Sequence, residues 1–387
     1  MGNGAVKVII CVCAGALGRN LYRDIKQQKK KTTTTPLFWY HSPLTYPSFL
    51  AVHLSSVQLF LIPEMKLTTN IHEGNQTTIT EFILLGFGDL SQLHILLFLV
   101  FLVIYIVTMA GNILIIVLVV TDQHLHTPMY FFLGNLSCLE TCCTSTILPR
   151  VLASLLTGDR SISVMGCITQ FYFFGSLAGT ECLLLSVMSY DRYLAICKPL
   201  HYATRMNGRL CLQLVVGLWI GGFMSVFIFI FMLPQLTFCG PNEIDHFFCD
   251  FHPITKLSCT DTHVVEVAGL ISCAMFTLPP FVLTVASYVC IISNIMRIPS
   301  TTGRQKAFST CSSHLIVVTI YYGTLILVYL LSDSDALRDL NKVFSVFYGV
   351  LTPLVNPLIY SLRNKEVKKT LRKALLRSFV FFRNSYF

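Results

Sequence analysis

Seven long apolar runs constrain the fold of this chain more than any other feature of its sequence. A helix needs about 20 mainly apolar residues to cross a hydrocarbon core of roughly 30 Å, and each run is long enough and ends at polar or turn-forming residues. The runs occupy 93–121, 128–150, 164–195, 208–234, 262–297, 309–331 and 341–362. They are too uniformly apolar for barrel strands, which alternate over about ten residues. We therefore predict an all-α membrane protein folded as a seven-helix bundle.

The composition and the motif content argue against other classes. Hydrophobic residues make up 54% of the chain and charged residues only 12%, which is too apolar for a soluble protein. The sequence has no metalloprotease motif, nucleophile elbow or glycine-rich phosphate loop, so we predict that it is not an enzyme. A transporter is expected to show internal repeats around a mid-membrane site. The halves of this chain are not self-similar, which places a transporter behind other membrane proteins.

The positions of Lys and Arg predict the orientation, because cytoplasmic loops retain these residues. The basic side has Arg192, Lys198, Arg205 and Arg209 after the third run, Arg297, Arg304 and Lys306 after the fifth, and 363–383 after the seventh. The opposite loops hold few bases and many acids. We therefore predict an extracellular N-terminus and a cytoplasmic C-terminus. The net charge of +9 then lies mostly on the inner face, where it suits anionic lipid and an intracellular partner, not nucleic acid.

The first 64 residues do not fit this orientation. They include the run Lys29-Lys30-Lys31, which should resist translocation ahead of an outward-facing first helix. We interpret 1–64 as an atypical leader that is disordered or absent from the mature protein, with Met65 as the working start.

The rest of the chain divides into three parts. We expect an extracellular tail at 65–92, the seven-helix domain at 93–362 and a cytoplasmic tail at 363–387. The tail at 65–92 contains the glycosylation sequence Asn75-Gln76-Thr77. A second match, at Asn135, lies inside the second apolar run, where a glycosyltransferase cannot reach it.

An ion pair stands at the inner end of the third run, in "MSYDRYLAIC". Ionisable residues in membrane helices are candidates for function, and they are tolerated when they are paired. Asp191 and Arg192 therefore have two interpretations. They could form a conformational switch, or they could only fix the depth of the helix by reaching toward the interface.

Other polar residues lie inside the apolar runs. In "NPLIY", Pro357 removes a helical hydrogen bond and predicts a kink, and Asn356 could satisfy the freed backbone group or bind water. The kink could act as a hinge or be purely structural. Asn112 and Glu140 fall in the middle of the first and second runs, and we expect them to pair with polar neighbours such as Asn356, because an unpaired carboxylate there is costly.

Four of the fifteen cysteines belong to the outer side of the receptor domain, namely Cys167 at the outer end of the third run and Cys239, Cys249 and Cys259 in the loop before the fifth. An oxidising compartment permits disulfides, and four cysteines allow three connectivities that sequence alone cannot separate. A zinc site in "HFFCDFH", formed by His246, Cys249 and His252, is a rival interpretation.

Four motifs in order resemble the signature set of vertebrate odorant receptors, a branch of the rhodopsin-like G protein-coupled receptors: "TPMYFFLGNLS", "MSYDRYLAICKPLHY", "KAFSTCSSHL" and "PLVNPLIYSLRNKEV". The resemblance covers about 67–377. It implies a plasma-membrane receptor with a short amphipathic eighth helix in the cytoplasmic tail. Its ligand would be a small volatile odorant, and its partner a stimulatory, olfactory-type G protein that raises cAMP. A non-olfactory chemoreceptor of the same class is the alternative.

The resemblance also implies roles for individual residues. Arg192 of the Asp191-Arg192-Tyr193 motif would be held by the acid at rest and released to the G protein, and Tyr288 would meet Tyr360 through water in the active state. Cys167 would pair with Cys249, and Cys239 with Cys259. Related receptors carry aspartate where Glu140 stands, often in a sodium site. The longer side chain argues against predicting a metal here, and we predict no cofactor.

In the resembling family the ligand lies between the outer halves of the third, fifth, sixth and seventh helices. The corresponding candidates are Phe174, Gly175, Ala178, Gly179, Ser272, Phe276, Tyr322, Leu325, Ile326, Tyr329, Val346 and Gly349. This set is apolar with few hydrogen-bonding groups, which suits a small, neutral, hydrophobic ligand. Gly175 and Gly179 lie four residues apart and could instead allow close helix packing.

Overall fold

The computed structural model describes residues 79–87, 93–239, 241–330, 342–363 and 367–372. The chain divides into the units Met1–Thr78 and Ile79–Phe387, and everything below concerns the second unit. The leader at 1–64, the start at Met65 and the glycosylation site at Asn75 lie outside the described residues, so those expectations stay predictions.

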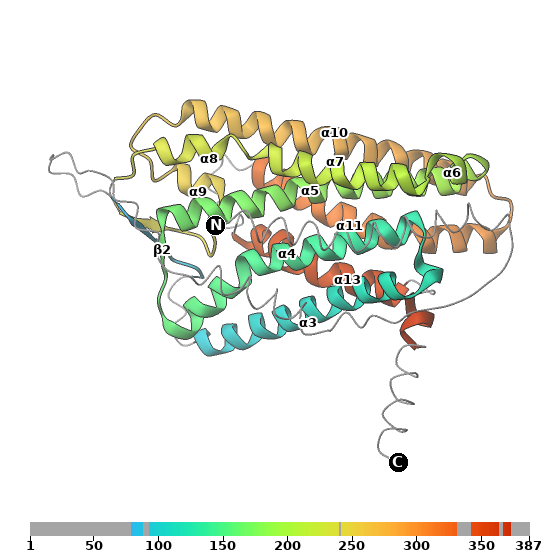
Figure 1. Cartoon of the computed structure of the whole chain (residues 1–387), viewed down its shortest axis with the longest axis horizontal. Coiled ribbons are helices and arrows are strands. Elements are labelled where there is room, and N and C mark those ends of the chain that lie inside the picture. Colours follow the sequence, from blue (N-terminus) through green and yellow to red (C-terminus); the bar gives the residue numbers. More distant parts are fainter. Residues whose placement is uncertain (1–78, 88–92, 240, 331–341, 364–366, 373–387) are drawn as a thin grey trace, which may run out of the picture. The chain divides into compact units, whose positions relative to one another are not determined.

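Seven apolar helical segments form the bundle, side by side along its length (Figure 1). The first three are α3 (His94–Thr121), α4 (Pro128–Thr157) and α5 (Val164–Cys197), and the fourth is α7 (Gly208–Ser225) followed by α8 (Phe229–Met232) and η3 (Leu233–Gln235). The fifth and sixth are α10 (His263–Met296) and α11 (Thr301–Leu330). The seventh, 342–363, contains the π-helical turn η4 (Phe347–Leu351) and α13 (Thr352–Arg363).

Local sequence signals explain several helix ends. Pro128 occupies the first turn of α4, where its missing N–H costs nothing, and Gly158 ends the helix with a φ of 76°. The Ser163 hydroxyl accepts a hydrogen bond from the Gly166 N–H at the start of α5, and Asn207 caps α7 through the Leu210 N–H.

Six of the described helical segments are long and apolar enough to cross a membrane, and α11 contributes a shorter apolar stretch, His314–Val328. The sequence predicted the sixth helix at 309–331, but α11 begins at Thr301. Its first turns are polar, and polar residues can continue a helix once it leaves the lipid. Hydropathy therefore marks the membrane crossing and not the full helix. The helix α4 also continues beyond its predicted end at residue 150, to Thr157, through the mainly apolar stretch VLASLLT.

The core lies around α4 and α5. α5 packs against α4, α7, α10 and α11. In contrast, α3 and α10 expose large apolar side chains, such as Val103 and Met275, which are 59% and 66% exposed. An apolar outer surface of this kind suits a lipid environment.

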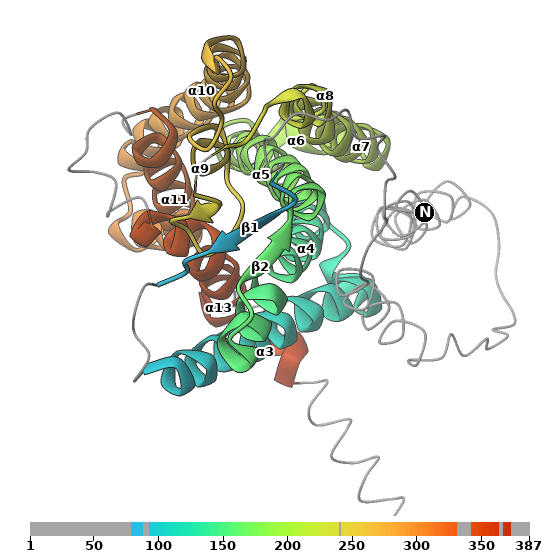
Figure 2. The same ribbon diagram turned by 90° about the vertical axis from the view of Figure 1, so that its left-hand side faces the viewer.

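A small lid covers one end of the bundle. β1 (Glu81–Leu84) pairs antiparallel with β2 (Ser161–Ser163) and parallel with β3 (Glu243–Ile244). Figure 2 views the bundle from this end, with β1 and β2 in front of the helices. The short helix α9 (Phe251–Thr255) completes the lid, and its residue Phe251 packs with Phe82 and Phe171 in one buried cluster.

Two disulfides hold the lid, and they are the pairs that the family resemblance implies. Cys167 at the start of α5 is bonded to Cys249, with a Cα–Cα distance of 5.3 Å. Cys239 and Cys259 close the loop on itself, with a Cα–Cα distance of 5.9 Å. Because Cys249 is bonded to Cys167, its sulfur is not available as a thiolate, which removes the basis of the zinc interpretation at His246, Cys249 and His252.

The opposite end of the bundle has short elements: η2 (Gln123–Leu125) and α6 (Pro199–Arg205). Residues 367–372 are helical, and the Thr370 hydroxyl donates to Asp122 Oδ2 at 2.8 Å. The neighbouring residues 364–366 and 373–387 lie outside the described part, so the eighth helix stays a prediction.

Candidate functional site

The Asp191-Arg192 pair is formed at the end opposite the lid. Arg192 Nη2 lies 3.8 Å from Asp191 Oδ2, and both side chains are largely buried. The second Asp191 oxygen accepts a hydrogen bond of 2.9 Å from the hydroxyl of Tyr202 on α6. Burial, reinforced by the charge of Asp191, raises the pKa of Tyr202, so this hydroxyl stays a donor. Asp191 is therefore held by two partners, one of which the sequence did not indicate.

Tyr288 on α10 contacts a residue that the sequence did not indicate. Its hydroxyl lies 2.6 Å from Nδ1 of His314 on α11, and both residues are buried. The side chain of Tyr360 is outside the described residues, so its water-mediated contact with Tyr288 stays a prediction. His314 was missed, because a single histidine in "SSHL" gives no sign that a tyrosine 26 residues earlier will face it.

The middle of the bundle contains the polar group predicted around Asn356. Asn356 Nδ2 donates to Glu140 Oε1, as expected for two buried polar groups. The backbone carbonyl that is freed at the kink has a different hydrogen-bond donor from the one considered. Pro357 has no N–H to offer the carbonyl of Pro353, and Asn112 Nδ2 donates to that carbonyl at 3.1 Å. Of the two roles that the sequence offered for Asn356, the contact with the freed carbonyl is taken by Asn112, and water binding stays a prediction.

A second carboxyl group was missed. Glu181 on α5 is 3% exposed and close enough to interact electrostatically with Glu140. Within the described residues, Glu140 Oε2 and Glu181 Oε1 have no hydrogen-bond partner. The sequence does indicate Glu181, because an acidic residue inside an apolar run is the criterion by which Glu140 was selected.

Some of the predicted ligand residues lie at the lid end of the bundle, whereas others contact a neighbouring helix. Phe174 faces the bundle mouth, where its ring centroid lies 5.0 Å from that of Phe248 in the lid and 5.7 Å from that of Tyr348. Gly349 lies beside it, since an added Cβ would come 3.7 Å from the Phe174 ring. On α11, Leu325 is buried. Ala178, Phe276, Ile326 and Val346 are half-buried, and the side chain of Tyr329 is outside the described residues.

Three other candidates contact α7 and the turn that follows it. A Cβ on Gly175 would lie 3.1 Å from Val226, and one on Gly179 would lie 2.9 Å from the Ser225 hydroxyl. Ser272 donates to the Ser225 carbonyl at 2.5 Å. The two glycines therefore allow close helix packing, and this packing favours that alternative over ligand contact.

The hydroxyl of Tyr322 is also engaged. It donates to the Cys182 carbonyl at 2.6 Å, and the neighbouring Tyr321 donates to the Ala178 carbonyl at 2.7 Å. These bonds join α11 to α5 and occupy the hydroxyl of Tyr322.

The lid contributes polar residues to the mouth that the sequence analysis did not select. Asp250 is 6% exposed, accepts from the Tyr348 hydroxyl at 3.2 Å and accepts from the Phe251 N–H at 2.7 Å. Gln170 on α5 accepts from the Cys249 N–H at 3.0 Å. Asp250 could have been selected from the sequence, because it directly follows Cys249, which the implied disulfide holds next to α5.

The outer edge of the mouth carries charge. Lys342 forms an ion pair with Asp245, and the adjacent His246 is buried against the Phe247 ring at 4.7 Å. Burial lowers the pKa of His246 to about 4. The imidazole is thus neutral at physiological pH, as its apolar surroundings require.

The helical bundle, the lid joined by a disulfide to α5 and the buried Asp191-Arg192 pair together define a seven-helix membrane receptor. Comparison with known proteins supplies the family. A family model described as "Olfactory receptor" matches residues 101–378. The chain is 50% identical over 305 residues to human olfactory receptor 11A1, covering 79% of this chain and 96% of the relative. Mouse olfactory receptor 5AP2 is 47% identical with the same coverage of both chains. The chain belongs to the olfactory receptor family, whose members are G protein-coupled receptors and not enzymes.

Proposed function

We propose that this receptor binds small, neutral, hydrophobic odorants in the lid half of the bundle. The observation that carries the proposal is the mouth formed by Phe174, Phe248 and Tyr348, which is aromatic and has one buried carboxylate. Asp250 accepts hydrogen bonds from Tyr348 and from its own helix, so it orients the lid and is not a free counterion for an amine. Apolar walls with one or two polar contacts suit a neutral ligand.

The proposed ligand contacts follow from this mouth. Phe174, Ala178, Phe276, Tyr322, Leu325, Ile326, Tyr329, Val346 and Gly349 remain in the set, and Phe248, Asp250 and Tyr348 join it. Gly175, Gly179 and Ser272 act through the packing of α5 and α10 against the end of α7.

The proposed switch lies at the opposite end. Arg192 is held by Asp191, and Asp191 is held in turn by Tyr202. The Tyr288 to His314 hydrogen bond joins α10 to α11 at the same level of the bundle as Cys311 and Ile291. When ligand binding moves α11, this bond breaks and Arg192 becomes free to contact a stimulatory, olfactory-type G protein, which raises cAMP. Asn356, Pro357 and Tyr360 supply the hinge, and Tyr193 packs against the cluster that contains Tyr288 and Cys311.

The remaining assignments rest on the same orientation. Disulfides form in oxidising compartments, which supports a lid that faces outward in the plasma membrane and a basic cytoplasmic end. A leader at 1–64, an extracellular tail at 65–92 and an eighth helix after residue 363 complete the proposed organisation. A chemoreceptor role outside the olfactory tissue is the second candidate.

The ligand assignment is tested by a cAMP assay with a panel of neutral and charged odorants on the wild type and on the Phe174→Asp and Phe174→Leu variants. We expect neutral agonists for the wild type, a modest loss for Phe174→Leu and a complete loss for Phe174→Asp, which adds a charge to an apolar wall. A wild-type receptor that responds only to amines, or a Phe174→Asp variant that keeps its neutral agonists at normal surface expression, would contradict the assignment.

A further inference from the structure

A second cleft lies at the lid end, between the turn after β1, the start of α3 and the end of α4. The space that it encloses is small, about 30 Å³, and the rest of the cleft is open to the surface. Most of its wall is apolar, with Leu84, Phe87, Leu97, Val151, Leu155 and Phe247. Phe87 stacks between Phe101 and Phe247, with ring centroids 5.3 Å away on each side. The wall is therefore fixed in place by its own packing.

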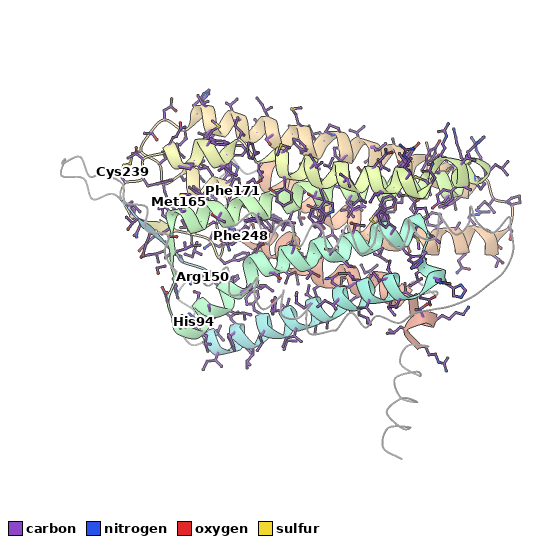
Figure 3. The ribbon with its side chains drawn as sticks, in the orientation of Figure 1. His94, Arg150, Met165, Phe171, Cys239 and Phe248 are labelled. Carbon is purple, nitrogen blue, oxygen red and sulfur yellow. A yellow bond between two sulfur atoms is a disulfide. The ribbon has the colours of Figure 1, made fainter. Side chains whose placement is uncertain are left out.

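The polar part of this cleft contains two arginines. It consists of His94, Arg150, Ser154 and Arg160, and Figure 3 shows His94 and Arg150 at the same end of α3 and α4. None of the residues that line the cleft in the described part of the chain is acidic. Both arginine side chains are half-buried, so their charges face a partly apolar space.

Arg160 makes only weak contacts. Its Nη1 donates to the Leu85 carbonyl at 3.4 Å, and its Nη2 lies 3.4 Å from His94 Nε2. No carboxylate pairs with it among the described residues. A guanidinium carries five N–H donors, so most of its hydrogen-bonding capacity remains.

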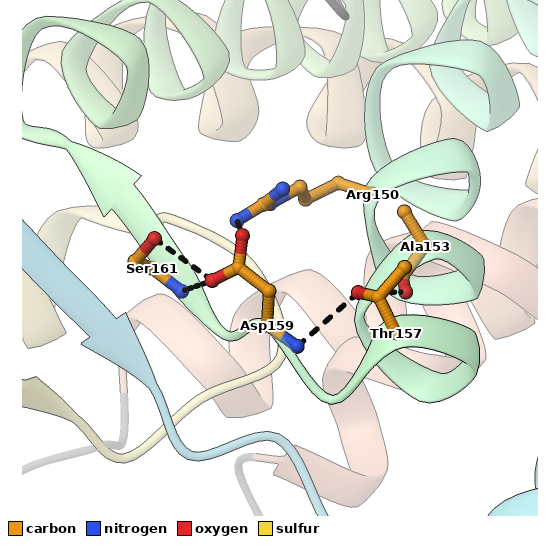
Figure 4. Close-up of polar contacts among 5 residues, drawn as sticks. All are labelled: Arg150, Ala153, Thr157, Asp159 and Ser161. Carbon is orange, nitrogen blue, oxygen red and sulfur yellow. Dashed lines mark hydrogen bonds and ion pairs between the residues drawn. The ribbon is translucent and has the colours of Figure 1, made fainter.

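Arg150 is held loosely as well. Its Nη2 lies 4.0 Å from Asp159 Oδ2, whereas Asp159 Oδ1 accepts from the backbone N–H and the hydroxyl of Ser161 at 2.9 and 2.8 Å (Figure 4). These two hydrogen bonds hold the pKa of Asp159 below its usual value. The carboxylate is thus stabilised by Ser161, and Arg150 can turn to another anion at small cost.

We propose that this cleft binds an amphipathic anion, and that its natural ligand is a medium-chain carboxylate. Arg160 and Arg150 hold the headgroup, since arginine matches a carboxylate with two parallel hydrogen bonds. The enclosed space holds only this headgroup, and the alkyl chain runs out of the cleft over the half-buried side chains of Leu97 and Leu155. The cleft is built from α3, α4 and the lid, whereas the proposed odorant site lies against α5, α11 and η4. The receptor thus has separate sites for a charged and a neutral apolar molecule.

The test is native mass spectrometry of the purified full chain in detergent, titrated with decanoate and with the uncharged analogue decanol. We expect one saturable decanoate per receptor and no saturable decanol. Arg160→Gln and Arg150→Gln should each weaken decanoate binding by about tenfold or more. Arg205→Gln, which removes an exposed base on α6, is the matched control and should bind as the wild type does.

A third variant covers the case in which the arginine variants fail to fold. Leu155→Trp fills the cleft without altering its charge, and it should abolish decanoate binding. Equal binding of decanol and decanoate, or full decanoate binding by Arg160→Gln or by Leu155→Trp, would overturn the proposal. A lipid phosphate offers the same chemistry, so competition by added phosphatidylglycerol would name lipid as the source and overturn the assignment to a carboxylate. Absence of competition would name the free carboxylate. The readout needs neither odorant nor G protein, so its failure is distinct from failure of the proposed function.

Discussion

Replacing Asn112 with alanine tests how the seventh helix is stabilised at its kink. Asn112 is fully buried on α3, and its amide donates at 3.1 Å to the Pro353 carbonyl, which Pro357 leaves without a helical partner. Leaving a buried carbonyl unsatisfied costs about 1 to 3 kcal/mol, and hydrogen bonds between membrane helices average about 0.6 kcal/mol with a maximum near 1.7. We therefore expect Asn112→Ala to lower the free energy of unfolding by about 1 to 2 kcal/mol.

The partner mutation makes the argument specific. Pro357→Ala restores an N–H that can donate to the Pro353 carbonyl within the helix. In the Pro357→Ala background, Asn112→Ala should therefore cost about 1 kcal/mol less than in the wild type, a coupling that a double-mutant cycle measures. Unfolding can be followed with a thiol-reactive dye, because Cys143, Cys182 and Cys211 are buried free thiols. Asn294→Ala, at an exposed position on α10, is the control. Strictly additive costs would refute the role given to Asn112.

Three further predictions concern the lid and the leader. Cys167→Ser or Cys249→Ser should block surface expression, since losing a native disulfide costs about 2 to 5 kcal/mol. Cys290→Ser, which removes an exposed free thiol, is the control and should reach the surface. An active receptor in which mass spectrometry finds a free thiol at Cys167 or Cys249 would exclude the pairing. Burial lowers the pKa of His246 from 6.5 to about 4, so between these two pH values the unfolded chain binds a proton that the folded chain does not. The free energy of unfolding should therefore be highest above pH 6.5 and should fall by up to about 3 kcal/mol as the pH approaches 4. A His246→Phe variant whose thermal stability depends on pH as the wild type's does would contradict this. A chain starting at Met65 should reach the surface, carry a glycan at Asn75 and signal at least as well as the full chain; its failure where the full chain succeeds would show that the leader is required.

Hydropathy predicted the helices well, because crossing lipid demands long apolar segments whatever the tertiary contacts. It could not predict where helices end in water, as the start of α11 at Thr301 shows. The π-helical turn at Phe347–Leu351 was not predicted either, because nothing in the apolar run 341–362 distinguishes it from an ordinary helix.

Side-chain partners were harder to predict than side-chain importance. Asn112, Glu140 and Asn356 were selected correctly as a buried polar group, yet only the arrangement of α3 against α13 decides that Asn112, and not Asn356, satisfies the Pro353 carbonyl. Gly175 and Gly179 lie at the expected depth on α5, but the rotation of the helix turns them toward α7. A sequence gives depth in the membrane by counting residues, whereas rotation depends on packing against neighbours.

The central claim is that a ligand bound at the lid end releases Arg192 at the opposite end. Ligand-stimulated cAMP production by the wild type and by Arg192→Ala, compared at equal surface expression, tests it most directly. We predict a saturable response for the wild type and none for Arg192→Ala, because the variant keeps the bundle and the odorant site but loses the cation offered to the G protein. A normally expressed Arg192→Ala receptor with a full cAMP response would contradict the claim.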